Sequence, residues 1–262
     1  MLRHQNGSLL QLEDAEIYYQ VSGSPTGHPL LLLHGGLGSL EDFSAIAGSI
    51  SEHFFVIAVD LRGHGRSTLG RKPLSYLQHQ LDIQALIAHL NLNEYSVLGF
   101  SDGGIVGYRL AIENAAIRAL VTVGAQWRIS DQDACYEILS GVTPETWTEI
   151  FPDAPRKYSE LNPHGNFAEL VQSCTRLWTD LGPSGYPGDA IARIQCPTLI
   201  LRGDSDFLLS LEEAADAQTM INGASLGNIP FCSHAAIEES PDIAARLICD
   251  FLNEPRKRHT DT

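Results

Sequence analysis

From residue 29 onward, short apolar runs alternate with stretches in which apolar residues recur at helical spacing. The runs are rich in Val, Ile and Leu without polar alternation, as is typical of parallel strands that are buried on both faces. Five such strands are predicted, at residues 29–34, 54–60, 96–100, 119–125 and 196–203. The stretches between them predict helices, because their apolar residues line one helical face, as in residues 82–90. The order predicts an α/β fold with a mostly parallel central sheet and helices on both faces.

Two segments depart from this alternation. The first 22 residues contain EIYYQVSG and predict an antiparallel strand pair at the sheet edge. Residues 126–190 hold all three tryptophans and no clear buried strand, but include a helix-like piece at 166–178. We therefore expect a core domain made of residues 1–125 and 191–262. We expect a helical lid, residues 126–190, inserted after the fourth main-sheet strand.

Glycines surround a serine at the end of the third predicted main-sheet strand, in GFSDG (99–103). The pattern G-x-S-x-G is typical of a sharp strand-to-helix turn that lifts a serine hydroxyl clear of the sheet. Only glycine at 99 and 103 lets the neighbouring backbone pass so closely. Ser101 is therefore a candidate nucleophile. The alternative interpretation is a glycine-rich turn in which the serine only caps a helix.

A serine nucleophile needs a base and a group that orients the base. Asp204 and Asp206 follow the last of these strands, and His234 follows a further short apolar run. The chain order Ser, Asp, His is the one expected for this turn motif. His234 would accept the Ser101 proton, and one of the two aspartates would hold its imidazole. The alternative for His234 is a capping or surface histidine.

A glycine pair follows the first main-sheet strand, in LLLHGGLGS. A glycine there leaves a backbone N–H free to bind a substrate oxygen, and the second donor would be the N–H after the nucleophile. We expect Gly36 and Asp102 to form this oxyanion hole, with Gly35 and Leu37 in contact with substrate. A phosphate-binding loop is the competing interpretation, but GxGxxG and GxxxxGK[ST] are both missing from this segment.

Charge and composition restrict the partners. The net charge of −15 disfavours nucleic acid, and no apolar run is long enough to span a bilayer. The N-terminal residues lack the apolar core of a secretion signal. Five scattered cysteines without a CxxC pair favour free thiols in a reducing, cytoplasmic compartment over disulfides or a metal site. We expect a small-molecule substrate, no cofactor or metal, and a monomer or homodimer; the basic residues 256–258 are interpreted as a solvated tail.

The combined motifs resemble the α/β-hydrolase superfamily. The resemblance covers nearly the whole chain: LLLHGGLGS, VIAVDLRGHGRS, VLGFSDGG, CPTLILRGDSD and CSH. Within the superfamily, GFSDGG, the GAQW that follows the fourth strand and the compact lid are most similar to the valacyclovir-hydrolase-like (biphenyl-hydrolase-like) group. The resemblance implies an α/β-hydrolase fold and a cofactor-independent serine hydrolase, most similar to carboxylesterases.

The resemblance also assigns roles to residues. The family's acid lies three residues after the glycine of its G-x-x-D turn, which selects Asp206 and leaves Asp204 as a turn residue. The D-x-R-G-x-G-x-S block is a structural loop in the family, so Asp60, Arg62, His64 and Ser67 are expected to have no catalytic role. A serine nucleophile argues against dehalogenase and epoxide-hydrolase activity, since those members use aspartate.

Two residues keep two interpretations each. The Asp102 carboxylate either is an ordinary helix-start acid or attracts a substrate ammonium group, as in amino-acid esters. The tryptophans either form a small core of the lid, or Trp127 faces the substrate.

The leading function is hydrolysis of carboxylic esters, thioesters or amides through an acyl-enzyme. The alternatives are carbon–carbon bond hydrolysis of a ring-fission diketone and a weakly catalytic ligand-binding or receptor protein.

Overall fold

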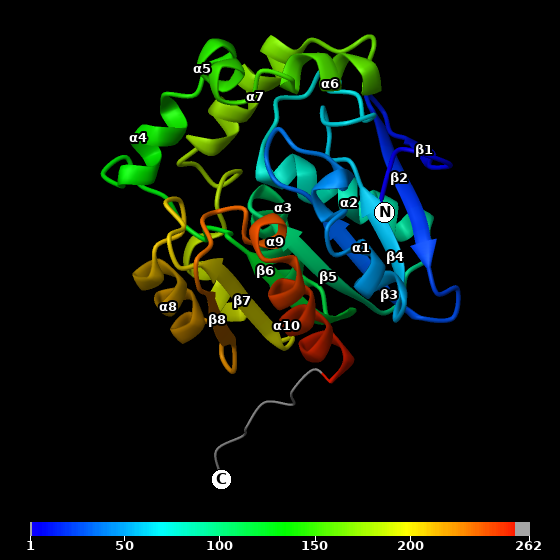
Figure 1. The fold of residues 1–262 in the computed structure, drawn as a ribbon, viewed down its shortest axis with the longest axis vertical. Coiled ribbons are helices and arrows are strands. Elements are labelled where there is room, and N and C mark those ends of the chain that lie inside the picture. The colour runs from blue at the N-terminus through cyan, green and yellow to red at the C-terminus, as the bar shows by residue number, and fades with distance from the viewer. Residues whose placement is uncertain (1, 255–262) are drawn as a thin grey trace.

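The computed structural model describes residues 2–254, apart from the side chain of Glu113. Its centre is a sheet whose strand order is β1-β2-β4-β3-β5-β6-β7-β8 (Figure 1). The bounds of the strands are β1 Ser8–Gln11, β2 Glu16–Gly23, β3 His28–Leu33, β4 Phe54–Val59, β5 Tyr95–Phe100, β6 Ile117–Val123, β7 Thr198–Gly203 and β8 Ser225–Ile229. All five predicted main-sheet strands are present, and β8 forms from the short apolar run before His234.

The pairing confirms the mostly parallel sheet. Strands β4, β3, β5, β6, β7 and β8 pair in parallel, and β2 pairs antiparallel with both β1 and β4. The predicted antiparallel pair at the edge is therefore confirmed. Because the carboxyl ends of the parallel strands meet at one edge, the loops after β3, β5, β6, β7 and β8 lie at that edge.

Helices cover both faces of the sheet, as predicted. One face carries α2 (Tyr76–His89), α3 (Asp102–Glu113) and α8 (Leu211–Met220). The other face carries η1 (Leu40–Phe43), α1 (Ala47–Ser51), α9 (Ala236–Glu239) and α10 (Pro241–Asn253). Successive leucines of β3 show why both faces are apolar: Leu31 and Leu33 pack into one core, and Leu30 and Leu32 into the other.

Four helices lie between β6 and β7, within the helical insertion (residues 126–190). They are α4 (Ala134–Ser140), α5 (Pro144–Ile150), α6 (Ala154–Leu161) and α7 (Phe167–Trp178), and the short η2 (Gly188–Arg193) leads back to the sheet. Figure 1 shows these helices above the carboxyl ends of the parallel strands. The segment predicted to be a lid is therefore helical and lies on the side of the candidate site.

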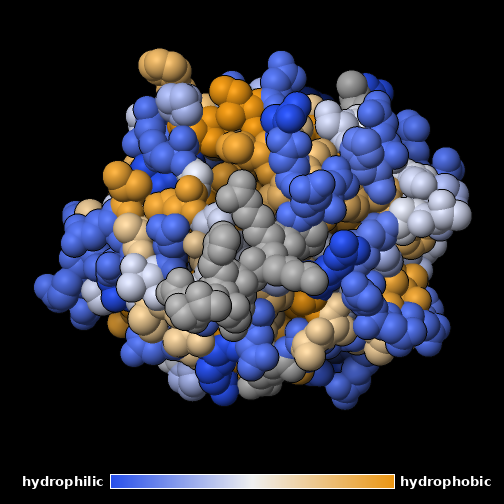
Figure 2. Space-filling view, turned by 90° about the horizontal axis from the view of Figure 1, so that it is seen from below, coloured by the Kyte–Doolittle hydropathy of each residue, from blue (hydrophilic) through white to orange (hydrophobic). Residues whose placement is uncertain are grey.

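The opposite end of the molecule is mostly hydrophilic, with apolar residues in separate patches (Figure 2). Within residues 2–254, no helix is long and apolar enough to cross a bilayer. The basic residues 256–258 lie outside the described part of the chain.

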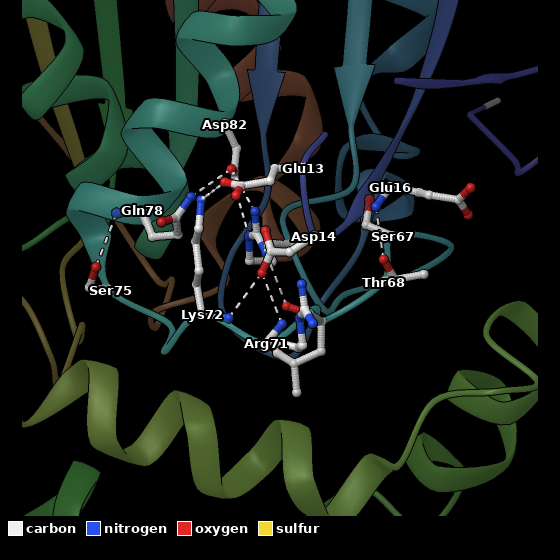
Figure 3. Close-up of polar contacts among 12 residues, drawn as sticks. Glu13, Asp14, Glu16, Ser67, Thr68, Arg71, Lys72, Ser75, Gln78 and Asp82 are labelled. Atoms are coloured by element: carbon white, nitrogen blue, oxygen red, sulfur yellow. Dashed lines mark hydrogen bonds and ion pairs between the residues drawn. The ribbon is translucent and has the colours of Figure 1, made fainter. Parts of the chain in front are cut away.

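The D-x-R-G-x-G-x-S loop that follows β4 is held by buried polar contacts. Arg62 donates from Nε to Asp82 at 2.7 Å and from Nη1 to Asp14 at 3.1 Å. Asp14 also accepts the backbone N–H groups of Arg71 and Lys72, as Figure 3 shows. Burial raises the pKa of Asp14, but these donors together lower it to about 2. The contacts fit the structural role expected for this loop.

Asp60, His64 and Ser67 of the same loop are buried as well. Asp60 accepts the Leu40 N–H at 2.9 Å, and the Ser67 hydroxyl donates to the Asp60 carbonyl at 2.6 Å. His64 contacts the Arg62 carbonyl through Nδ1 at 2.9 Å. These side chains are engaged in holding the loop together.

Candidate active site

Ser101 lies at the turn between β5 and α3, in a backbone conformation that is rare for residues with a side chain. Its φ is 49° and its ψ is −118°. A Cβ on Gly99 would collide with the backbone of Gly103, and a Cβ on Gly103 would collide with the carbonyl of Leu33. The steric reason given for both glycines is therefore confirmed. Local crowding holds the strained serine with its side chain at the carboxyl edge of the sheet.

The structure brings Ser101, His234 and Asp206 into one chain of hydrogen bonds. Nε2 of His234 lies 3.0 Å from the Ser101 hydroxyl. Nδ1 of His234 lies 3.0 and 3.1 Å from the two carboxylate oxygens of Asp206. With its proton on Nδ1, the imidazole donates to Asp206 and accepts from Ser101. These distances suit transfer of the serine proton to histidine.

The acid is fixed by its own loop. One oxygen of Asp206 accepts the backbone N–H groups of Leu208 and Leu209, at 2.9 and 3.0 Å. Asp204 has a different position: its carboxylate accepts the N–H of Cys232, in the turn before His234. The structure thus joins Asp206, and not Asp204, to the histidine.

The histidine loop is supported by a glycine and two aromatic rings. Gly124 has φ of 61°, and a Cβ there would lie 3.0 Å from the His234 ring. Phe100 and Phe207 lie 5.3 and 5.9 Å from that ring, measured between centroids. Sequence reasoning missed Gly124, although a glycine directly after a strand's carboxyl end was a usable signal.

The glycine loop after β3 lies beside the serine. A Cβ on Gly35 would be 3.3 Å from the Ser101 Cβ, and one on Gly36 would overlap the Asp102 carboxylate and the Trp178 ring. Within the described residues, neither the Gly36 N–H nor the Asp102 N–H has a hydrogen-bond acceptor in the protein. Two unused donors beside the candidate nucleophile are the arrangement that an oxyanion hole requires.

Asp42 braces this loop, a role that sequence reasoning did not assign. Its two carboxylate oxygens accept the N–H of Gly35 at 3.3 Å and of Ser39 at 3.2 Å. Burial raises the pKa of Asp42 to about 7, and the nearby charge of Glu238 adds to the effect. The loop conformation therefore depends on a carboxylate that is only partly ionised near neutral pH.

Asp102 is buried, and its carboxylate is already hydrogen-bonded. Trp178 Nε1 lies 3.0 and 2.8 Å from its two oxygens, and the Tyr76 hydroxyl donates to Oδ1 at 2.9 Å. Burial raises the pKa of Asp102 to about 6, although the Trp178 and Tyr76 hydrogen bonds oppose the rise. Both carboxylate oxygens thus accept hydrogen bonds from uncharged side chains. An acid that only stabilises the start of a helix would not need these partners.

Trp127 has a different setting from the one expected for a residue that faces substrate. It is buried in the main core, and its indole N–H donates to the Glu213 carbonyl of α8 at 3.1 Å. Trp178 is the tryptophan that contacts the glycine loop and Asp102, and its ring lies 6.5 Å from that of Trp147. After β6 the chain turns towards α8. Trp127 therefore lies away from the site, although it is close to the end of β6 in the sequence.

A cavity of about 720 Å³ lies between the glycine loop and the helical insertion. Gly36 and Leu37 form part of one wall, so the predicted substrate contact of Leu37 is geometrically available. The facing wall carries apolar side chains of α5 and its neighbours, including Trp147, Ile150 and Phe151. The lining also includes five acidic residues and one lysine: Glu41, Asp42, Asp153, Glu160, Glu238 and Lys157.

Comparisons with known proteins agree with this geometry. Residues 30–247 match the model of the alpha/beta hydrolase family. The chain is 30% identical to the serine hydrolase BPHL of Mus musculus over 251 residues, covering 90% of this chain and 82% of the relative. It is 23% identical to 2-hydroxy-6-oxo-6-(2'-aminophenyl)hexa-2,4-dienoic acid hydrolase of Metapseudomonas resinovorans, covering 87% and 84%.

Solved structures share the fold. An esterase from Exiguobacterium antarcticum superposes with a TM-score of 0.77 at 23% identity, covering 94% of this chain and 99% of that one. The family model matches residues 30–247, a segment that runs from β3 into α10. It therefore includes Ser101, Asp206 and His234. The chain therefore belongs to the alpha/beta hydrolase family, and it is a hydrolase on that fold.

Proposed function

We propose that this hydrolase cleaves carboxylic esters through an acyl-enzyme formed on Ser101. The observation that carries the proposal is the continuous hydrogen-bonded chain from Ser101 through His234 to Asp206. A serine hydroxyl gains nucleophilicity only when a base can take its proton in line with attack.

The first half of the reaction forms the acyl-enzyme. The Ser101 oxygen attacks the ester carbonyl carbon while its proton passes to Nε2 of His234. The negative charge on the carbonyl oxygen is held by the N–H groups of Gly36 and Asp102. The tetrahedral intermediate then breaks its bond to the alcohol oxygen, which leaves with the proton from His234.

The second half returns the free enzyme. Water loses a proton to His234 and attacks the acyl carbon, and the bond to the Ser101 oxygen breaks. The serine recovers the proton, and the carboxylic acid is released. Asp206 holds the imidazole and stabilises the imidazolium that forms twice per cycle.

The site's surroundings support small-molecule esters with an apolar part. The cavity of about 720 Å³ begins at the glycine loop, and its far wall is apolar. Cavities of this size accept drug-sized molecules. Amino-acid esters, thioesters and amides remain candidate substrates within the same mechanism, with Asp102 and Leu37 as the proposed contacts.

The test is mass spectrometry of the intact protein after treatment with a fluorophosphonate, together with hydrolysis of p-nitrophenyl esters. We expect one adduct on Ser101 that is lost in Ser101→Ala and His234→Ala, and turnover that is lost in parallel. A folded protein that takes no label would contradict the proposal and favour a binding protein with an unreactive serine.

Carbon–carbon bond hydrolysis is the second candidate. It is favoured by the similarity to the Metapseudomonas enzyme, whose name specifies a ring-fission product. Turnover of a vinylogous diketone that greatly exceeds turnover of p-nitrophenyl esters would select it.

We also propose that the protein works in a reducing compartment such as the cytoplasm. The five cysteines all lie within residues 2–254 and form no disulfide there, and Cys174 and Cys232 are buried. Cysteines that stay outside disulfides suit a compartment that keeps thiols reduced.

A further inference from the structure

We propose that Trp178 is a positioning residue that fixes the separation of the two oxyanion donors, Gly36 and Asp102. The inference rests on the proposed function, since it concerns the oxyanion hole of that reaction. It assigns a part of the catalytic geometry to the helical insertion.

A single indole ring contacts both donor residues. Trp178 is the last residue of α7, and its Nε1 donates to the Asp102 carboxylate at 2.8 Å. The same ring covers Gly36 so closely that a Cβ at residue 36 would lie 2.6 Å from Cζ2. Trp178 as a whole is 5% exposed, so its ring has no room for another rotamer without displacing its neighbours.

The Asp102 side chain is held from two directions. Tyr76, the first residue of α2, donates its hydroxyl to the carboxylate from the core at 2.9 Å. Trp178 approaches the same carboxylate from the insertion. The N–H that is proposed to bind the oxyanion belongs to Asp102 itself, so a shift of the Asp102 side chain would also disturb that donor.

The chain beyond Trp178 is fastened to the core as well. The Tyr186 hydroxyl donates to the Trp178 carbonyl at 3.1 Å, and its ring lies 5.0 Å from that of Tyr76. Arg109 of α3 donates to the Gly185 carbonyl at 2.8 Å. The end of α7 is thereby fixed relative to α2 and α3, so Trp178 can act as a rigid spacer.

Donor placement has a large effect on this kind of catalysis. Oxyanion donors act when they lie about 2.7–3.1 Å from the oxygen, and losing one typically costs about 100-fold in kcat or more. A change that loosens the spacing between the two donors, but keeps both, should reduce kcat by a smaller factor. We therefore expect roughly a tenfold loss in kcat for Trp178→Phe, which removes the N–H and keeps an aromatic ring.

The experiment measures kcat and KM for p-nitrophenyl acetate, a substrate too small to need the cavity, in Trp178→Phe, Tyr76→Phe and Tyr95→Phe. Tyr95 is the matched control: its buried hydroxyl accepts from Asn114, and it belongs to neither the site nor the cavity. We expect kcat to fall in the first two variants with KM nearly unchanged, and Tyr95→Phe to keep native kcat.

A double-mutant cycle separates positioning from general destabilisation. If Trp178 acts through Asp102, Trp178→Phe should cost less than about threefold in kcat in an Asp102→Ala background, where no side-chain acceptor for the indole N–H is left. An equal loss in both backgrounds, or native kcat in Trp178→Phe, would overturn the inference while the native enzyme still hydrolyses esters. A native enzyme that neither hydrolyses nor takes label would instead overturn the proposed function, and this inference with it.

Discussion

The carboxylate of Asp42 accepts the backbone N–H of Gly35, and the distance between nitrogen and oxygen is 3.3 Å. This contact places an ionisable group against the residue that directly precedes Gly36, the proposed oxyanion glycine. Protonation removes acceptor capacity from the carboxylate, so the glycine loop should be held less firmly when Asp42 is neutral.

The first prediction concerns pH. Since burial raises the pKa of Asp42 to about 7, its brace is complete only above that pH. Asp42→Asn, which resembles the protonated form, should lower kcat for p-nitrophenyl acetate about tenfold at pH 8.5 and have a smaller effect at pH 6. Glu238→Gln should move the acid limb of the native profile to lower pH. A ratio of native to variant kcat that stays constant from pH 6 to 9 would contradict the role.

The choice of acid gives the second prediction. Asp206→Asn should reduce kcat by roughly 10⁴-fold, because the histidine loses the partner that fixes its tautomer. Asp204→Asn is the matched control, and it should change kcat less than tenfold, since the Asp204 carboxylate accepts from Cys232 and Ser205 and not from His234. The comparison needs kcat for one ester in both variants and confirmation of folding by circular dichroism. Similar losses in the two would refute the assignment.

Glycine substitutions give the third prediction. Gly36→Ala should abolish most of the activity, because the new methyl group would overlap the Asp102 carboxylate and the Trp178 ring. Gly48→Ala, in the exposed part of α1, meets no atom within 4 Å. It should keep full activity and gain about 0.5–1 kcal/mol in the free energy of unfolding, because alanine favours the helix. Ester turnover and urea unfolding check both variants.

The fourth prediction concerns stability. His79 on α2 is buried, neither of its ring nitrogens has a hydrogen-bond partner among the described residues, and its pKa is lowered from 6.5 to about 3 by burial. Between these two pH values the unfolded chain binds the additional proton. The contribution of neutral His79 is therefore complete above pH 6.5 and is lost as the pH falls towards 3.

Urea unfolding at pH 8 and pH 5 checks this sign. From pH 8 to 5 the native protein should lose about 2 kcal/mol more of its free energy of unfolding than His79→Leu, as linkage requires for one proton. Equal losses in the two proteins would mean that His79 takes up its proton in the folded state.

The fifth prediction concerns substrate charge. If Asp102 contacts a substrate ammonium group, the native enzyme should prefer an amino-acid ester over its N-acetyl analogue, and Asp102→Asn should reduce that preference about tenfold. The ratio of the two kcat/KM values is the measurement, because disturbance of the Trp178 contact affects both substrates alike. An unchanged ratio would contradict a contact between Asp102 and a substrate ammonium group.

The sequence was sufficient for features that depend on neighbours along the chain. Strand runs, the glycines around Ser101 and the Ser, Asp, His order all follow from local sterics and from the rule that site residues follow strand ends. The joining of His234 to Asp206 rather than Asp204 agrees with the spacing taken from the resemblance.

Contacts between residues that are distant in the sequence could not be predicted in this way. Trp178, Tyr76 and Asp42 come from three different elements, and no spacing relates them to Ser101. The expectation for Trp127 shows the limit: it follows a strand end by four residues, yet the chain turns it into the core against α8. Only the path of the insertion decides which tryptophan reaches the site.

The turn that carries Ser101 separates the reacting group from its support. Gly99 and Gly103 bear the steric demands of the turn, whereas the residue at 101 points its side chain outwards from a conformation that the surrounding backbone imposes. Another nucleophile of similar size at residue 101 would have the same exposure and would lie beside the same N–H groups, those of Gly36 and Asp102. The scaffold can thus acquire new chemistry by exchange at a single position, provided that both glycines stay.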